Sequence, residues 1–397
     1  MSGGVKMGAL RQLRLLRLLL LLLVSTPLQP FQSLQLLQPW FPPILGVSAK
    51  APVGHHAKDD FLLKALAIDR KKLDSSYFKK YDNIKWEGKI IAIGDIHGDL
   101  ESLKLILRHA NLINENNEWI AENVLLVQVG DILDRGIYGP LIYDYLFKLQ
   151  KEAPLKNSRV LLIMGNHEQL NLCGYFDYVN EKEVEVFFRN NLNYRLFHFV
   201  STRGEYFKKL IRLPAIAKVN DILFVHAGIS KQISSLSLDT IRLKTRLQIE
   251  NMCRVLSYDK SINYVSREGV LWHDHISRTA PHDEKEACSI LSHVFNNYKA
   301  KHLVVGHIRQ LTHEISTYCK GGLFLIDTGM SLFMNHGQQY PNYLVVQNGT
   351  FKSVHLIVEV NKKTKNCDSL EIQLDSPNKK TFCVHTKEAL LSPPSKG

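Results

Sequence analysis

Five segments of the chain place a polar side chain able to bind a metal directly after an apolar run. Three are short motifs bounded by glycine: GDIHG at 94–98, GDILDRG at 130–136 and GNHE at 165–168. The other two are ILFVHAG, which contains His226, and HLVVGH, which ends at His307. Carboxylate, imidazole and amide groups together are typical ligands of Mn, Fe or Zn and suit calcium less well. One such motif is weak evidence, but five of them predict one shared metal centre.

Hydrolysis of a phosphate ester is the chemistry that this set of residues could perform. The reaction needs a nucleophile, positive charge near the phosphoryl oxygens and a proton for the leaving group. Two divalent cations about 4 Å apart supply the first two. A histidine backed by a carboxylate suits the third, because the carboxylate raises the imidazole pKa and fixes its orientation.

The elements that must position these residues begin at Lys89 with an alternation of apolar runs and helical periodicity. We expect strands at 89–94, 123–129 and 159–164, separated by helices at 99–111 and 139–150. Such alternation implies parallel pairing. Further strands are expected at 221–226, 302–306, 323–327, 343–347 and 352–360. The absence of long helices between them after residue 300 favours antiparallel pairing there. The predicted fold class is α/β (α+β), with two packed mixed sheets flanked by helices.

Residues 169–215 show helical periodicity without a strand signal and are rich in aromatic residues, such as Tyr175, Tyr178 and Phe199. We predict a helical cap inserted beside the site. The aromatic residues could line a deep entrance that favours phosphotyrosine, or they could form the core of the cap itself. The sequence leaves both interpretations open.

In combination, the motifs resemble the calcineurin-like metallophosphoesterases, and within them the serine/threonine-type phosphoprotein phosphatases. The resemblance covers about residues 89–346 and implies a two-sheet sandwich with two divalent metal ions, Mn²⁺ first and Fe or Zn as alternatives. The implied metal ligands are Asp95, His97, Asp131, Asn166, His226 and His307, with Asp131 bridging both metals. His167 would be the general acid, oriented by Asp134. Arg135 would bind phosphate as a fork of donors, with Asn166 beside it.

Met164 is a departure from the eukaryotic members of this superfamily, in which an arginine that contacts phosphate precedes the third motif. The candidates to replace that arginine are Arg203, Arg278 and Arg309. The methionine, the insertion after GNHE and the VVGH context resemble the Shewanella-like protein phosphatases. A leader peptide with lysine- and asparagine-rich stretches suits an apicomplexan member of that family.

The function that this resemblance implies is a metal-dependent phosphoprotein phosphatase, a phosphoric monoester hydrolase acting on Ser/Thr or Tyr. Two alternatives stay open. The first is a symmetric dinucleoside tetraphosphate hydrolase, which shares the fold and the ligands. The second is a catalytically inactive secreted binding module. The physiological substrate and the preference between Ser/Thr and Tyr are not fixed by the sequence.

The first 49 residues have the pattern of a leader. Four basic residues and no acidic one occur in residues 1–17, followed by the apolar run Leu18–Val24. This pattern is typical of a secretory signal, and the run is shorter than the ~20 residues that span a bilayer. An uncleaved signal anchor is the alternative, and a buried core helix fits less well. We therefore expect the endoplasmic reticulum or a later endomembrane compartment.

The rest of the chain is expected to divide into three parts. Residues 50–88 form a polar N-terminal extension with a helix around 59–70, and residues 89–360 form the metallophosphoesterase domain. Residues 361–397 form a tail that is either weakly structured or contains strands. Six cysteines without a CxxC pair argue against a zinc knuckle. Cys367 and Cys383 are the expected disulfide, with free thiols elsewhere.

The charge of the chain constrains its partners. The formal net charge is +12, and removing residues 1–49 takes four positive charges with it and leaves +8. Such a balance favours anionic partners or membrane surfaces in general. The resemblance implies a phosphoprotein or phosphopeptide substrate, and the leader suggests association with a membrane. No stripe of Arg and Lys with interleaved aromatic residues is present, so nucleic acid is not expected as a partner. The oligomeric state is left open.

Overall fold

The computed structural model describes residues 80–252, 266–360, 367–375 and 378–392, which lie within one compact unit of the chain. The predicted leader and the helix predicted around 59–70 fall outside the described residues. None of the helices in the part of the chain that the structure describes has both the length and the apolar character needed to cross a membrane.

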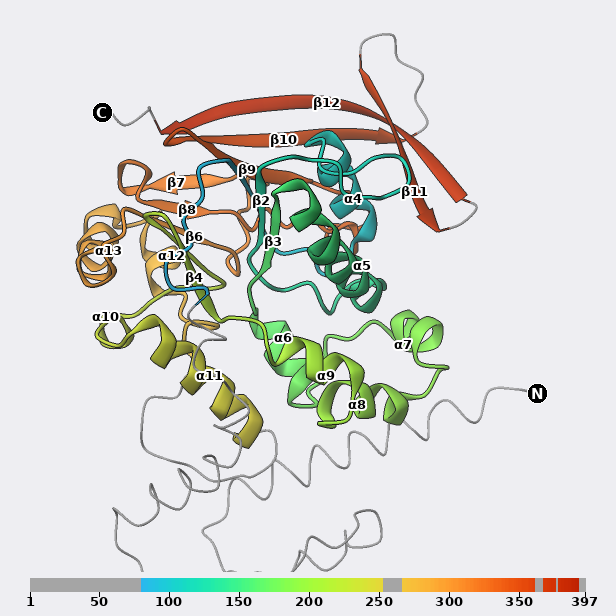
Figure 1. Cartoon of the computed structure of the whole chain (residues 1–397), viewed down its shortest axis with the longest axis horizontal. Coiled ribbons are helices and arrows are strands. Elements are labelled where there is room, and N and C mark those ends of the chain that lie inside the picture. Colours follow the sequence, from blue (N-terminus) through green and yellow to red (C-terminus); the bar gives the residue numbers. More distant parts are fainter. Residues whose placement is uncertain (1–79, 253–265, 361–366, 376–377, 393–397) are drawn as a thin grey trace, which may run out of the picture. The chain divides into compact units, whose positions relative to one another are not determined.

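Two mixed β-sheets form the framework of the protein (Figure 1), which confirms the predicted fold class. The first sheet has the order β11-β12-β10-β9-β1-β2-β3 and the second has the order β4-β5-β6-β8-β7. The strands of the first sheet are β1 Lys89–Ile93, β2 Val124–Gln128, β3 Arg159–Leu162, β9 Asn342–Gln347, β10 Thr350–Val360, β11 Asp368–Asp375 and β12 Asn378–Ser392. Those of the second are β4 Ile216–Val219, β5 Ile222–Val225, β6 His302–Val305, β7 Ser316–Tyr318 and β8 Leu323–Leu325.

The facing sides of the two sheets share one apolar core. Ile90, Leu125 and Leu161 contribute to it from the first sheet, and Phe224 and Phe324 from the second. Alternate residues of β1 to β3 point the other way, into a second core beneath the helices. Burial on both faces explains why these strands read as continuous apolar runs rather than as alternating patterns.

Helices cover the outer faces of the sheets. They are α4 Leu100–His109, α5 Gly139–Glu152, α10 Lys231–Ser234, α11 Leu238–Met252, α12 His275–Thr279 and α13 Glu284–Tyr298. The α4 helix packs on β11 and the α5 helix on β3, while α11 packs on β4. The side chain of Asp99 caps α4 by accepting from the N–H of Ser102 at 2.9 Å. The α4 helix therefore begins directly after the GDIHG motif.

The residues of the predicted cap fold into helices α6 Asn166–Leu172, α7 Glu181–Phe187, α8 Leu192–Val200 and α9 Glu205–Leu210. In Figure 1 these helices lie beyond the lower ends of β2 and β3. Phe188, Phe199 and Tyr206 are buried within the cap, where the rings of Phe199 and Tyr206 stack with their centroids 4.9 Å apart. Tyr175 and Tyr178 remain 43% and 39% exposed. The aromatic residues therefore divide, some forming the core of the cap and others staying at its surface.

Strand pairing differs from the prediction after residue 300. The β9 and β10 strands pair antiparallel as expected, but β6 pairs parallel with both β5 and β8. The connection between β6 and β8 contains the short strand β7, which pairs antiparallel with β8 at the edge of the sheet. The chain reverses direction before β7 and again before β8. The β8 strand therefore runs in the same direction as β6 without a long helix between them.

Of the two expectations for residues 361–397, the strand-containing one fits the described residues, which contribute two strands to the first sheet. Nearly the whole length of β10 pairs antiparallel with β12, and β11 pairs antiparallel with β12 on its other side. Phe382 and Val384 of β12 are buried in the core beneath the helices. The sheet thus extends well past residue 360.

Disulfide bonds are more numerous than predicted. The expected bond between Cys367 and Cys383 is confirmed. The prediction of free thiols elsewhere was wrong, because Cys288 of α13 bonds to Cys319 with their Cα atoms 5.4 Å apart, and Cys173 is also disulfide-bonded. The separation of 31 positions between Cys288 and Cys319 carries no spacing pattern that reveals the pair. Only the packing of α13 against the turn before β8 brings them together.

Candidate active site

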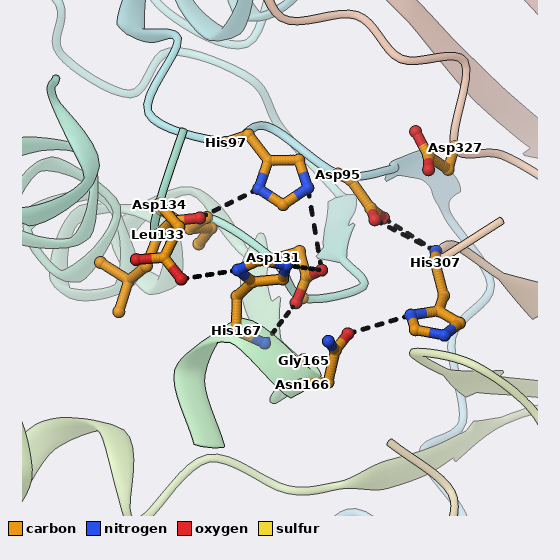
Figure 2. Close-up of polar contacts among 12 residues, drawn as sticks. Asp95, His97, Asp131, Leu133, Asp134, Gly165, Asn166, His167, His307 and Asp327 are labelled. Carbon is orange, nitrogen blue, oxygen red and sulfur yellow. Dashed lines mark hydrogen bonds and ion pairs between the residues drawn. The ribbon is translucent and has the colours of Figure 1, made fainter. Parts of the chain in front are cut away.

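The six predicted metal ligands lie together where strands of both sheets end, and Figure 2 labels all of them except His226. Asp95 follows β1, Asp131 follows β2 and Asn166 starts α6 just after β3, while His226 and His307 follow β5 and β6. The backbone N–H of Gly306 donates to the carbonyl of His226 at 2.8 Å, which ties the last two loops together. The carboxyl ends of parallel strands share one edge of a sheet, and this places the ligands side by side.

Backbone conformation also contributes to this convergence. His97, Asp131 and His307 have φ values of 45°, 57° and 66°, in the left-handed region that residues with a Cβ rarely adopt. The N–H groups of Ile96 and His97 both donate to the carbonyl of Asp131 at 3.0 Å. The first two motifs therefore hold each other in this unusual form, as is common at functional sites.

Four ligand atoms converge at the position predicted for the second metal. Asn166 Oδ1 lies 2.7 Å from His226 Nε2 and 2.9 Å from His307 Nδ1. His226 Nε2 also lies 3.3 Å from Asp131 Oδ2. The other ring nitrogen of His226 lies 3.0 Å from the carbonyl of Val129, so Nδ1 is the natural donor and the Nε2 lone pair points at the oxygens. This cluster of acceptor atoms fits a bound cation.

The position predicted for the first metal lies on the other side of Asp131. His97 Nε2 is 3.8 Å from Asp131 Oδ2, and His97 Nδ1 is 3.0 Å from the carbonyl of Leu133, which again leaves Nε2 free to ligate. Asp95 accepts from the N–H of His307 at 3.1 Å. Burial, followed by the charges of Asp327 and Asp131, raises the pKa of Asp95 well above its usual value. Positive charge is needed to stabilise so many buried carboxylates together.

The histidines differ in their electrostatic setting. Burial and the neighbouring His167 lower the pKa of His97 to about 4. Burial and the neighbouring His226 lower the pKa of His307 to about 4. Both imidazoles are therefore neutral near pH 7, the form in which histidine ligates metals. The residues present thus fit a pair of divalent metal ions.

His167 lies between Asp134 and Asp131 in Figure 2. Its Nδ1 is 2.6 Å from Asp134 Oδ2, and its Nε2 is 3.9 Å from Asp131 Oδ2. Burial alone would lower the pKa of His167, but the charge of Asp131 and the hydrogen bond to Asp134 outweigh it and raise the pKa above its usual value. The shift favours the protonated form of His167, whose Nε2 is directed at the metal positions, as a general acid requires.

Three further residues hold the site together, and the sequence analysis assigned no role to them. Glu168 accepts from the N–H groups of Gly165, Asp131, Ile132 and Leu133 at 2.8 to 3.2 Å. Asn171 donates to Asp134 Oδ1 at 2.9 Å, and buried Asp327 lies beside Asp95 (Figure 2). Only Glu168 had a signal in the sequence, as the last residue of GNHE and the third of a helix, where a glutamate commonly caps the N-terminus.

None of the bonds described for Met164 and the three candidate arginines reaches a predicted metal ligand. Met164 is buried in the apolar core beneath the helices. Arg203 lies exposed between α8 and α9, and Arg278 on α12 pairs with Asp274 at 2.5 Å. Arg309 donates to Asn335, and its side chain lies against Gly329. Arg309 is near enough to the site for its charge to oppose the rise in the pKa of buried Asp327. Arg135 follows Asp134 in the chain, and its charge lowers the pKa of His167, against the larger effects that raise it.

Comparison with known proteins supports the family resemblance that the motifs indicate. Residues 88–310 match the family model described as calcineurin-like phosphoesterase. Shewanella-like protein phosphatase 1 of Plasmodium berghei is 62% identical over 337 residues, which are 85% of this chain and 92% of that protein. Shewanella-like protein phosphatase 2 of Arabidopsis thaliana is 41% identical over 99 residues, 25% of each chain.

A solved structure shares the fold. The cold-active protein-tyrosine phosphatase of a psychrophilic Shewanella species matches with a TM-score of 0.59 and 24% identity, covering 68% of this chain and 79% of that one. At this identity the likeness concerns the fold alone. With the family match and the extended similarity to the Plasmodium protein, the chain belongs to the calcineurin-like phosphoesterases, and within them to the Shewanella-like protein phosphatases.

Proposed function

We propose that this protein hydrolyses phosphate monoesters on phosphoproteins and uses two divalent metal ions as cofactors. One observation carries the proposal: the ligand atoms of Asn166, His226 and His307 converge on Asp131, next to a histidine that Asp134 holds in a donor orientation. The names of its relatives, which describe protein phosphatases, favour a phosphoprotein over a nucleotide.

Each group then has a separate task. When bound, the two metal ions would supply a water nucleophile at neutral pH and positive charge for the phosphoryl oxygens. Arg135 binds the phosphate through the fork of its guanidinium. His167 gives the Nε2 proton to the leaving oxygen of the substrate, while Asp134 keeps Nδ1 in place. The charge that develops on the leaving group is neutralised by that proton.

Mn²⁺ is the metal we propose first. The donor set of carboxylate, imidazole and amide side chains suits Mn, Fe and Zn. Reconstituting metal-free protein separately with each of these ions, and measuring both binding and turnover, tests the choice. The proposal for manganese is wrong if Mn²⁺ binds both positions and supports no turnover while Zn or Fe does.

Side-by-side kinetics on a phosphotyrosyl peptide, a phosphoseryl peptide and diadenosine tetraphosphate test the substrate class. Hydrolysis of either peptide with little activity on the nucleotide is the expected result. A protein active on the nucleotide and inactive on both peptides would be the dinucleoside tetraphosphate hydrolase instead. A protein inactive on all three with both metals bound would be the binding module.

We also propose that residues 1–49 direct the chain into the secretory pathway. The basic start and the short apolar run support this route, and so do the disulfides Cys288–Cys319 and Cys367–Cys383, because such bonds persist in oxidising compartments. Imaging of the full chain fused to a C-terminal fluorescent protein, with and without residues 1–49, tests the proposal. Sequencing the mature N-terminus distinguishes a cleaved signal from an anchor retained in the membrane.

A further inference from the structure

Arg135 occupies an unusual backbone conformation. Asp134 and Arg135 have φ values of 70° and 67°, so two successive residues with a Cβ lie in the left-handed region. That region is disfavoured for such residues. The side chain of Arg135 is also exposed, so burial does not fix it. Contacts from elsewhere in the chain must therefore hold both the backbone and the guanidinium.

The cap segment 178–180 supplies these contacts to the backbone of Arg135. The N–H of Arg135 donates to the carbonyl of Tyr178 at 2.8 Å. The Nδ2 of Asn180 donates to the carbonyl of Arg135 at 2.9 Å. The Oδ1 of Asn180 accepts from the N–H of Lys182 at 3.0 Å and so caps α7. Asn180 thus connects the first turn of a cap helix to the GDILDRG motif.

The side chain of Tyr178 supplies the third contact. The guanidinium carbon of Arg135 lies 4.5 Å from the centroid of the Tyr178 ring, within the range of a cation–π interaction. The same ring lies 5.1 Å from the ring of His167. No ion pair joins Arg135 to a carboxylate among the residues that the structure describes. A ring orients the guanidinium without using its five N–H donors, which a carboxylate would occupy.

We propose that Tyr178 and Asn180 are positioning residues, which together with the cap hold Arg135 ready to receive the phosphate of the substrate. This inference rests on the proposed role of Arg135 in phosphate binding. It assigns the helical insertion a part in the reaction: the cap completes the phosphate site by fixing an arginine that belongs to another motif. The ring of Tyr178 acts on the phosphate through Arg135 and is not itself a catalytic residue.

A double-mutant cycle tests whether Tyr178 acts through Arg135. The measurements are kcat/KM for an aryl phosphate and the inhibition constant for inorganic phosphate, which has no leaving group. We expect Tyr178→Leu to lower kcat/KM and weaken phosphate inhibition about fivefold. In an Arg135→Ala background the same change should alter either quantity by less than about twofold. Equal effects of Tyr178→Leu in both backgrounds would overturn the proposal.

The cycle also separates this inference from the proposed function. If Arg135→Ala leaves kcat/KM and phosphate inhibition unchanged, the phosphate-binding role of Arg135 is wrong and the positioning role is wrong with it. If Arg135→Ala weakens both and Tyr178→Leu alters neither, only the positioning role is overturned. If Tyr178→Leu raises KM for the aryl ester and leaves phosphate inhibition unchanged, the ring contacts the leaving group instead.

Three matched variants complete the design. Tyr178→Phe keeps the ring and should restore kcat/KM to near the wild-type value. Phe197→Leu removes a cap aromatic of similar exposure, 47%, with no ring contact to Arg135, and should leave phosphate inhibition unchanged. Asn180→Ser retains a neutral helix cap but is too short to reach the Arg135 carbonyl. We expect it to weaken phosphate inhibition with no change in melting temperature, and unchanged inhibition would count against the role of Asn180.

Discussion

The carboxylate of Asp134 lies 2.6 Å from Nδ1 of His167 and is fully shielded from solvent. Its second oxygen accepts from Asn171, so neither oxygen is free to rotate away. Because Asp134 cannot be solvated by water, its charge stabilises the imidazolium and fixes the direction of Nε2. This relationship is the structural basis for assigning the general acid.

Replacing His167 by Asn should separate proton donation from metal binding. The donor is lost while the six proposed ligands stay, so we expect turnover to fall roughly 10²- to 10⁴-fold with unchanged metal content. Steady-state kinetics and elemental analysis of the same preparation check this. His167 also lies close enough to His97 and Asp131 to hold an ion with them. Loss of one metal in the variant would make His167 a ligand instead.

Replacing Asp131 by Asn should remove metal. Asp131 belongs to two groups of side chains that could hold an ion, one with His97 and His167 and the other with His226 and His307. A carboxylate shared by two sites is needed by both, and the amide is a weaker ligand without charge. We expect less than full occupancy of both positions by elemental analysis after gel filtration. Two metals per chain in the variant would refute the bridging assignment.

The ligands could be predicted from the sequence because each one directly follows a strand whose apolar run is easy to recognise. Asp95, Asp131 and His226 are examples, and their meeting follows from the shared edge of parallel strands. Asn171 and Tyr178 could not be predicted in this way. Asn171 is one turn of helix beyond His167, and Tyr178 lies in an irregular segment, so their roles depend on tertiary contacts that leave no spacing pattern.

The outer strands could be predicted only as one of two possibilities for residues 361–397. The β11 and β12 strands carry many charged residues, as in the stretch NKKTFCVHTKE of β12, because much of their surface faces solvent. The buried positions Ile372, Phe382 and Val384 are too few to stand out in the sequence. The parallel pairing of β6 with β8 was missed since its crossover contains a three-residue strand rather than a helix.

Replacing Glu168 by Gln should destabilise the fold around the second motif. The carboxylate accepts four backbone N–H groups, and the amide would present its own N–H₂ to some of them. Leaving buried donors unsatisfied costs about 1–3 kcal/mol each, so we expect a loss of roughly 3 kcal/mol. Urea denaturation measures it. Glu181→Gln, at the exposed start of α7, is the control and should change stability by less than about 0.5 kcal/mol.

Glu183 should make stability depend on pH. It is buried in the cap and pairs with Arg195, whose Nε lies 2.8 Å from Glu183 Oε1. Burial raises the pKa of Glu183 to about 7, and the charge of Arg195 offsets this only in part. The pKa of Glu183 in the folded state is above the unfolded value of 4.5. Ionising Glu183 therefore lowers the free energy of unfolding. This loss of stability is absent below pH 4.5, grows as the pH rises to about 7 and stays constant above pH 7.

The variant Glu183→Gln tests this dependence. The variant is less stable overall, because Arg195 loses its buried partner. The stability advantage of the wild type over the variant should nevertheless shrink as pH rises from 5 to 8, by a few kcal/mol at most. Thermal unfolding of both proteins across this range is the measurement. A difference that stays constant with pH would show that Glu183 is already ionised at pH 5.

Removing the Cys288–Cys319 disulfide should cost more stability than removing Cys367–Cys383. The two bonds close loops of 31 and 16 residues. The entropy that a bond removes from the unfolded chain grows with loop length, giving about 4 kcal/mol for the first and about 3 kcal/mol for the second. Paired serine variants, Cys288→Ser/Cys319→Ser and Cys367→Ser/Cys383→Ser, keep the other bonds intact during denaturation. The first bond connects α13 to the turn before β8. Buried Asp327, which lies beside the ligands, follows just after β8. If the second variant loses more stability, the pairing of β11 with β12 depends on its disulfide more than loop entropy predicts.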